Sequence, residues 1–173
     1  MFEKTIKSTS IYKGRMLGLR DDEVELPNGK ISHREICEHP GAVAIVPITN
    51  DGKIILIRQF RKPIEEVIYE IPAGLINKGE ELKDAAVREL EEETGYKANK
   101  IEFALTVYTS PGYSTEKLHI FIAKDLVKTQ NNPDEDENIE VAITPIDIAL
   151  QMIKSGEIKD GKTIVGICLV EIK

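Results

Sequence analysis

One stretch of the chain, residues 74–96, limits what the rest can fold into. It opens with Gly74, turns at Gly79, and continues from Glu80 to about Thr94 in residues that favour a helix. Gly95 stands where a glycine commonly ends a helix. The stretch therefore predicts a turn followed by a helix with a defined end.

Acidic side chains crowd the end of this expected helix. Glu89, Glu92 and Glu93 are spaced i, i+3 and i+4, so they project from one face, and Glu91 adds further charge. A solvated acidic face is the ordinary interpretation, but carboxylates are disfavoured in the last turn, where the helix dipole is negative. A divalent cation would offset this cost and the mutual repulsion, and oxygen donors suit Mg²⁺ or Mn²⁺.

The stretch resembles the signature of the Nudix hydrolases. That signature runs Gly, five residues, Glu, seven residues, Arg-Glu, an aliphatic, any residue, Glu-Glu, any residue, Gly, and an aliphatic. The residues that fill it in register are Gly74, Glu80, Arg88, Glu89, Leu90, Glu92, Glu93 and Gly95. Tyr96 in the final aliphatic position is the one departure. So many fixed positions make the match far more specific than a short glycine motif.

The resemblance implies an α/β fold, the Nudix α/β/α sandwich, with a mixed sheet between helices and the signature as strand, loop and helix. It also implies a bound Mg²⁺, with Mn²⁺ as the alternative. Arg88 is expected to orient the glutamates, and Glu70 to help complete the site. The metal ligands that the resemblance implies are the Ala73 backbone, Glu89, Glu92 and Glu93, of which Glu92 is also assigned a catalytic role.

Bulk composition narrows the class of protein. The 173 residues suit one domain with a small addition, and 41% hydrophobic residues indicate a globular chain. A net charge of −7 argues against broad nucleic-acid binding but not against a small phosphorylated substrate. Cys37 and Cys168 form no metal-binding motif and are expected to be small buried residues in a reducing cytosol. No apolar signal region or membrane-spanning run is present, so a cytoplasmic location is expected.

Residues 1–40 have the pattern of a small antiparallel β unit. The turn signal Asn28-Gly29 separates Val24–Leu26 from Lys30–Cys37, as in a β-hairpin. So small a sheet buries little surface alone, so we expect it to pack on the main domain or on a second subunit. Pro40-Gly41 marks the boundary with a Nudix domain over residues 41–173. Related pyrophosphatases use such a unit for dimerisation, which implies a homodimer.

Two strands are expected before the signature. Ala42–Ile48 is continuously apolar, which is typical of a strand buried on both faces, and Lys53–Phe60 follows the turn at residues 50–52. Arg58 and Arg61 lie at the end of the second strand. They are candidates for binding a diphosphate or terminal ribose, although arginines at such a position often face water.

Beyond the signature, a proline supports a subgroup assignment. Residues 101–109 and 118–124 are strand-like and flank a turn that contains Pro111 and Gly112. A proline about fifteen residues after the signature is typical of the ADP-ribose pyrophosphatase subgroup, which implies that Pro111 and Gly112 lie at the substrate.

Residues 130–138 form a polar, acidic segment. Its composition is typical of a solvated loop. In the resembled subgroup an acidic loop at this place closes over the metals and supplies a catalytic glutamate, which makes Glu135 and Glu137 equal candidates. If neither is the base, Glu89, Glu93 or Glu116 becomes the candidate. Helices are expected over Pro145–Ser155, ended by Gly156, and from about Thr163.

The activity that the resemblance implies is Mg²⁺-dependent hydrolysis of ADP-ribose to AMP and ribose 5-phosphate. Three alternatives stay open: hydrolysis of another nucleoside-diphosphate sugar or nucleotide diphosphate, a Nudix-fold sensor that binds ADP-ribose without cleaving it, and a scaffold without ligand. A pure sensor has no need of Glu89, Glu92 and Glu93, so these residues favour the enzyme.

Overall fold

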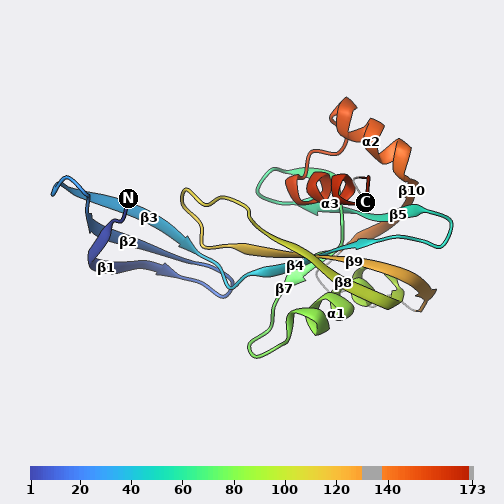
Figure 1. The fold of residues 1–173 in the computed structure, drawn as a ribbon, viewed down its shortest axis with the longest axis horizontal. Helices are drawn as coiled ribbons and strands as arrows, with labels where there is room; N and C mark the ends of the chain where they lie inside the picture. Colours follow the sequence, from blue (N-terminus) through green and yellow to red (C-terminus); the bar gives the residue numbers. More distant parts are fainter. Residues whose placement is uncertain (130–137, 172–173) are drawn as a thin grey trace. The chain divides into compact units, whose positions relative to one another are not determined.

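The computed structural model describes residues 1–129 and 138–171. The chain divides into two compact units, which Figure 1 draws as a ribbon. The first contains Met1–Gly41 and Val107–Leu118, and the second contains Ala42–Thr106 and His119–Lys173. The first unit therefore includes a segment from the middle of the chain in addition to the N-terminal residues.

The first unit is built on a three-stranded antiparallel sheet in the order β1-β2-β3, formed by β1 (Lys4–Lys13), β2 (Gly18–Glu25) and β3 (Ile31–Glu38). The predicted hairpin between β2 and β3 is confirmed. Gly29 takes a positive φ of 79° at its turn, and the Leu26 N–H donates to the Lys30 carbonyl at 2.8 Å. The Cys37 N–H donates to the Tyr113 carbonyl at 2.7 Å, which ties the 107–118 segment to β3.

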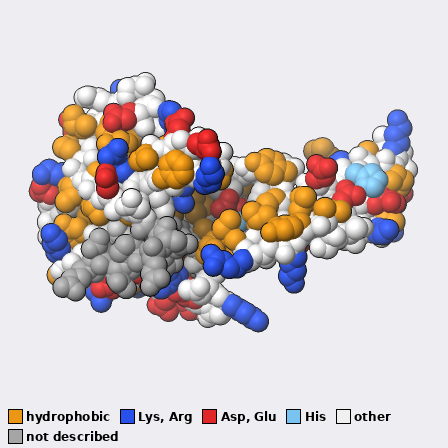
Figure 2. Space-filling model, turned by 180° about the vertical axis from the view of Figure 1, so that it is seen from behind, with side chains coloured by type: hydrophobic (Ala, Val, Ile, Leu, Met, Phe, Trp, Pro, Cys, Tyr) orange, Lys and Arg blue, Asp and Glu red, His pale blue; other side chains and the backbone are white. Residues whose placement is uncertain are grey.

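Much of this unit's apolar surface is exposed. Every residue of β1 is exposed, and hydrophobic side chains gather along the unit in Figure 2. The large exposed hydrophobic residues of this unit include Ile6, Ile11, Tyr12, Met16, Leu17, Leu19 and Ile31. A three-stranded sheet that leaves so many apolar side chains in water gains little from its own packing.

In its described residues, the second unit has two sheets and three helices. One sheet has the order β7-β4-β9-β8, from β7 (Ala73–Leu75), β4 (Ala42–Pro47), β9 (Lys117–Lys128) and β8 (Tyr96–Tyr108). The other has the order β10-β5-β6, from β10 (Ile139–Pro145), β5 (Lys53–Arg61) and β6 (Glu66–Glu70). The helices are α1 (Leu82–Thr94), α2 (Ile146–Ser155) and α3 (Gly161–Glu171). The expected α/β fold is confirmed.

Helices cover β4 from both sides, which explains its continuous apolar sequence. Val43 and Ile45 join a buried cluster with Ala85, Ala86 and Leu90 of α1. The alternate residues of β4 point the other way. In Figure 1, α1 lies on one side of these strands while α2 and α3 lie on the other. The signature helix is thereby fixed against a fully buried strand.

Three of the predicted helix ends are close to those in the structure. Gly95 and Gly156 take left-handed conformations as the C-terminal caps of α1 and α2, and the Gly95 N–H donates to the Glu91 carbonyl at 2.9 Å. Helix α3 begins two residues before Thr163. Within the described residues, none of the helices has both the length and the apolar character needed to cross a membrane.

The expectation that both cysteines are buried is wrong. Cys168 is exposed and Cys37 is half-buried. The buried residues of α3 are Thr163, Gly166 and Ile167, whose spacing defines its inner face, and Cys168 falls one position beyond that face.

Helix α3 approaches its neighbours closely at Gly166. A Cβ on this glycine would lie 2.9 Å from Cγ2 of Val46 and 3.0 Å from Cδ1 of Ile71. Both side chains are fully buried, and Val46 is β-branched, so it has little freedom to move aside. Glycine at this position therefore sets the distance between α3 and β4.

We predict that Gly166→Val destabilises the protein by roughly 2 kcal/mol or more, because the added methyl groups overpack this contact. The matched control is Gly161→Ala in the same helix, where an added Cβ meets nothing within 4 Å. That control should leave stability unchanged or raise it by up to about 1 kcal/mol. Urea unfolding measures both, and equal stability of the two variants would contradict the prediction.

Candidate functional site

The site begins where β7 meets helix α1. A Cβ on Gly74 would overlap the carboxylate of Glu89, which lies directly over this glycine. Only glycine leaves room for that carboxylate. Glu89 itself is 9% exposed, so a carboxylate has been brought from the helix to the backbone of the preceding strand. The resemblance predicted that both positions matter, and the structure adds the physical reason.

Arg88 joins the parts of this segment. Its guanidinium donates to Glu80 at 2.9 and 3.1 Å, to Glu89 at 2.6 Å and to Glu92 at 3.0 Å. It also donates to the Leu75 carbonyl at 3.1 Å. The carboxylates raise the pKa of Arg88, with the hydrogen bond to Glu80 as the main cause, and Arg88 lowers that of Glu80. These contacts favour the orienting role over direct contact with substrate.

Glu80 lies in the turn before α1, because the helix begins at Leu82 rather than at the expected residue 80. The Glu80 carboxylate accepts the Asn77 N–H at 2.9 Å, and the Glu80 N–H donates to the Asn77 carbonyl at 3.0 Å. This reciprocal pair closes the turn. Glu80 thereby links the turn to Arg88.

The third signature glutamate is directed to a different place. Glu93 is 2% exposed, and its Oε2 accepts the Ala73 N–H at 3.0 Å. Glu91, by contrast, pairs with Lys97 at 3.0 Å on the outer side of the helix. The carboxylates of the last turn thus have separate partners, which reduces the mutual repulsion that the sequence predicts.

The donor set suits a divalent cation in its chemistry. Carboxylate oxygens of Glu89, Glu92 and Glu93 and the Ala73 backbone are hard ligands, and Gly74 lets one of them approach the strand. As they stand, no three His, Cys, Asp or Glu side chains among the described residues are gathered tightly enough to hold a metal. Arg88 lies between Glu89 and Glu92 and contacts Oε1 of the first and Oε2 of the second.

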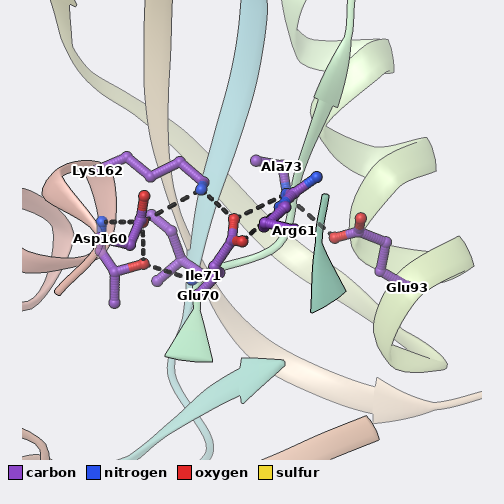
Figure 3. A network of polar contacts seen from close by, with 8 residues as sticks. Arg61, Glu70, Ile71, Ala73, Glu93, Asp160 and Lys162 are labelled. Carbon is purple, nitrogen blue, oxygen red and sulfur yellow. Dashed lines mark hydrogen bonds and ion pairs between the residues drawn. The ribbon is translucent and has the colours of Figure 1, made fainter. Parts of the chain in front are cut away.

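A second polar cluster surrounds Glu70, whose side chain is 1% exposed (Figure 3). Arg61 donates to its two oxygens at 2.5 and 2.8 Å, and Lys162 of α3 donates to Oε2. Burial is the largest single influence on the pKa of Glu70 and raises it. The contacts with Arg61 and Lys162 together outweigh burial, so the pKa is lowered overall and the carboxylate is ionised.

Arg58 does not join this cluster. Arg58 and Arg61 are three residues apart along β5, so their side chains point from opposite faces of the strand. The Arg58 guanidinium donates to Glu140 at 2.7 Å and lies 5.5 Å from the centre of the Tyr69 ring. The two arginines, both candidates for the diphosphate or the terminal ribose, have separate partners.

The remaining candidates lie outside the second unit or outside the described residues. Pro111 and Gly112 belong to the first unit, in a turn that the Tyr113 N–H closes by donating to Ser110 at 3.1 Å. Glu116 accepts the Thr109 hydroxyl at 2.5 Å in the same unit. Glu135 and Glu137 lie outside the described residues.

Sequence reasoning missed the contribution of α3. The Asp160 carboxylate accepts the Thr163 N–H at 3.0 Å and the Thr163 hydroxyl at 2.6 Å, as in a helix N-terminal cap, and Lys162 lies 3.1 Å away. The Thr163 Oγ1 in turn accepts the Ile71 N–H at 2.8 Å. The capping pattern was readable in the sequence, but its proximity to Glu70 was not.

Comparisons with known proteins agree with this geometry. Residues 38–164 match the Nudix domain family, and residues 3–36 match the nucleoside diphosphate sugar hydrolase N-terminal domain. The chain is 47% identical to the ADP-ribose pyrophosphatase of Bacillus subtilis and 47% identical to the methanol dehydrogenase activator of Bacillus methanolicus. Each match covers 99% of this chain and 94% of the relative.

A solved structure is also similar over nearly the whole chain. The crystal structure of an ADP compounds hydrolase superposes with a TM-score of 0.88 at 26% identity, covering 99% of this chain and 94% of that one. The family match, the full-length relatives and the arrangement of the signature residues confirm the resemblance drawn from residues 74–96. The chain belongs to the Nudix hydrolase family.

Proposed function

We propose that this protein hydrolyses the diphosphate bond of ADP-ribose to give AMP and ribose 5-phosphate, with Mg²⁺ as its metal. The observation that carries the proposal is the junction of Gly74, Glu89 and Arg88, which supplies oriented carboxylates beside a strand. The 47% identity to an ADP-ribose pyrophosphatase over 99% of the chain supports the choice of substrate. The cytoplasm is the proposed location.

The proposed mechanism assigns each chemical role to particular side chains. Glu89, Glu92, Glu93 and the Ala73 backbone would hold the metal. When bound, such an ion neutralises phosphate charge and makes a bound water more acidic. Arg88 keeps Glu89 and Glu92 close to their working positions. A loop carboxylate accepts the proton of the attacking water, and the partly exposed Arg61 binds the diphosphate.

The alternative substrate is another nucleoside-diphosphate sugar. The match of residues 3–36 to a nucleoside diphosphate sugar hydrolase domain supports this wider class. Purified protein should be incubated with Mg²⁺ and ADP-ribose, ADP-mannose, GDP-mannose or dinucleoside polyphosphates, and the products identified. Preferred cleavage of ADP-ribose supports the proposal, and binding of ADP-ribose without cleavage would point to a sensor.

We predict that Glu92→Gln lowers turnover at least about a hundredfold, the scale of losing a key electrostatic group. The matched control is Glu91→Gln, which changes the adjacent carboxylate that pairs with Lys97 instead of Arg88. It should retain near-normal turnover. Steady-state kinetics at saturating ADP-ribose and limiting Mg²⁺ measure both variants, and near-normal activity of Glu92→Gln would remove it from the metal site.

For the general base, we predict that one of Glu135→Gln and Glu137→Gln reduces kcat strongly while leaving substrate affinity nearly intact. Loss of a proton acceptor affects the transition state more than the bound ground state. The other variant serves as the control. Separate measurements of kcat and KM decide between them, and wild-type turnover in both would make Glu89, Glu93 or Glu116 the better candidate.

We also propose that the protein is a homodimer that uses its N-terminal sheet. Support comes from the exposed apolar residues of β1, which a second copy would remove from water. Two-fold dimers are the commonest soluble oligomers.

Light scattering at micromolar concentration should therefore give twice the 19.4 kDa of one chain. The double variant Ile6→Asp/Ile11→Asp should dissociate the dimer, because it puts charge on two of the exposed apolar positions of β1. Ile148→Asp changes a comparably exposed residue of α2 and should leave the mass unchanged. A wild-type mass near that of one chain would refute the dimer.

A further inference from the structure

Glu70 has two cationic partners where one would neutralise it. Arg61 reaches the carboxylate from β5 and Lys162 reaches it from α3, on the two sides seen in Figure 3. The two cations differ in access to solvent. The Arg61 side chain is 38% exposed, whereas that of Lys162 is 16% exposed. A ligand in solution can therefore reach Arg61 more readily than Lys162.

Lys162 is held on its second side as well. Its ammonium lies 3.1 Å from Asp160, and Asp160 is itself fixed because it caps α3 through Thr163. A lysine held between two carboxylates in the first turn of a helix has lost most of its side-chain freedom. Its geometry is that of a permanent partner of Glu70.

The burial of Glu70 explains why a permanent partner is useful. An ionised carboxylate that is almost fully removed from water is strongly destabilising when it loses its counter-charge. If Arg61 were its only partner, transfer of the guanidinium to a phosphate group would leave Glu70 in that condition. With Lys162 in place, Arg61 can move to a phosphate while Glu70 stays paired.

We propose that Lys162 is a positioning residue, which keeps Glu70 paired while Arg61 turns to the diphosphate of the substrate. The proposal rests on the proposed function, because it takes the ligand to be a diphosphate such as that of ADP-ribose. In the free protein Arg61 binds Glu70. In the complex Arg61 binds phosphate oxygens, which accept paired N–H donors as a carboxylate does.

A second contact shows that α3 is attached to β6 independently of Lys162. The Ile71 N–H donates to Thr163 Oγ1 at 2.8 Å, and both residues are fully buried. This bond fastens α3 to the end of β6 without Lys162. Loss of the lysine charge should therefore affect ligand affinity more than the attachment of α3.

The test is Lys162→Met against the matched control Lys159→Met. Lys159 lies two residues before α3 and pairs with Glu66 of β6 at 2.8 Å, but both members of this pair are exposed. Affinity for the non-hydrolysable α,β-methylene analogue of ADP-ribose is measured by calorimetry with Mg²⁺. Lys162→Met should weaken binding about tenfold, the effect of losing one charge-assisted contact. Lys159→Met should stay within about twofold, and Lys162→Arg should restore most of the affinity.

A double-mutant cycle tests whether Lys162 affects ligand binding through Arg61. In an Arg61→Lys background, Lys162→Met should weaken analogue binding much less than in the wild type, because the two residues act through one event. Equal effects in both backgrounds, or equal affinities of Lys162→Met and Lys159→Met, would overturn the positioning role. Thermal unfolding identifies any variant that does not fold, and Lys162→Gln then replaces Lys162→Met.

A failure of the proposed function can be distinguished from a failure of the positioning role alone. A wild-type protein that neither cleaves ADP-ribose nor binds the analogue overturns the function and the positioning role together. A wild-type protein that does both, with Lys162→Met unaffected, overturns the positioning role alone.

Discussion

Buried carboxylates that must be paired determine how the parts of the second unit are held together. Glu70 and Glu93 are 1% and 2% exposed, and carboxylates so far removed from water need hydrogen-bond donors. Glu70 draws Arg61 from β5 and Lys162 from α3, while Glu93 of α1 accepts the N–H of Ala73 at the start of β7. The hydrophobic core brings these elements together, and the polar contacts fix their relative positions within the unit.

The short segment from Glu70 to Ala73 is where these constraints meet. Its successive backbone and side-chain groups contact β5, α3, β4 and α1: the Pro72 carbonyl accepts the Ile45 N–H at 2.8 Å, and the Ile71 N–H donates to Thr163. A segment held at each residue by a different element has little freedom to adjust. Its geometry is therefore well suited to a site in which a backbone group and several carboxylates act together.

Local elements were predictable from the sequence, whereas contacts between distant residues were not. The ends of α1 and α2 follow from Gly95 and Gly156, because a helix C-terminus is decided within a few residues. The strand β7 was expected as the strand that opens the signature, whereas the short β6 was not predicted, since its few residues carry no clear alternation. The pairing of Lys162 with Glu70 spans 92 residues of sequence and depends on how α3 packs.

The same reasoning explains why the two arginines before the signature have separate partners. Their position in the sequence made both candidates for the diphosphate or the terminal ribose, but a strand sends residues of opposite parity to opposite faces. Arg61 therefore meets Glu70, and Arg58 meets Glu140 of β10. Arg58 also lies over Tyr69, so its charge is engaged on the far side of the sheet. Of the two, Arg61 is the one that meets the buried Glu70, and the chemistry proposed for this protein depends on it.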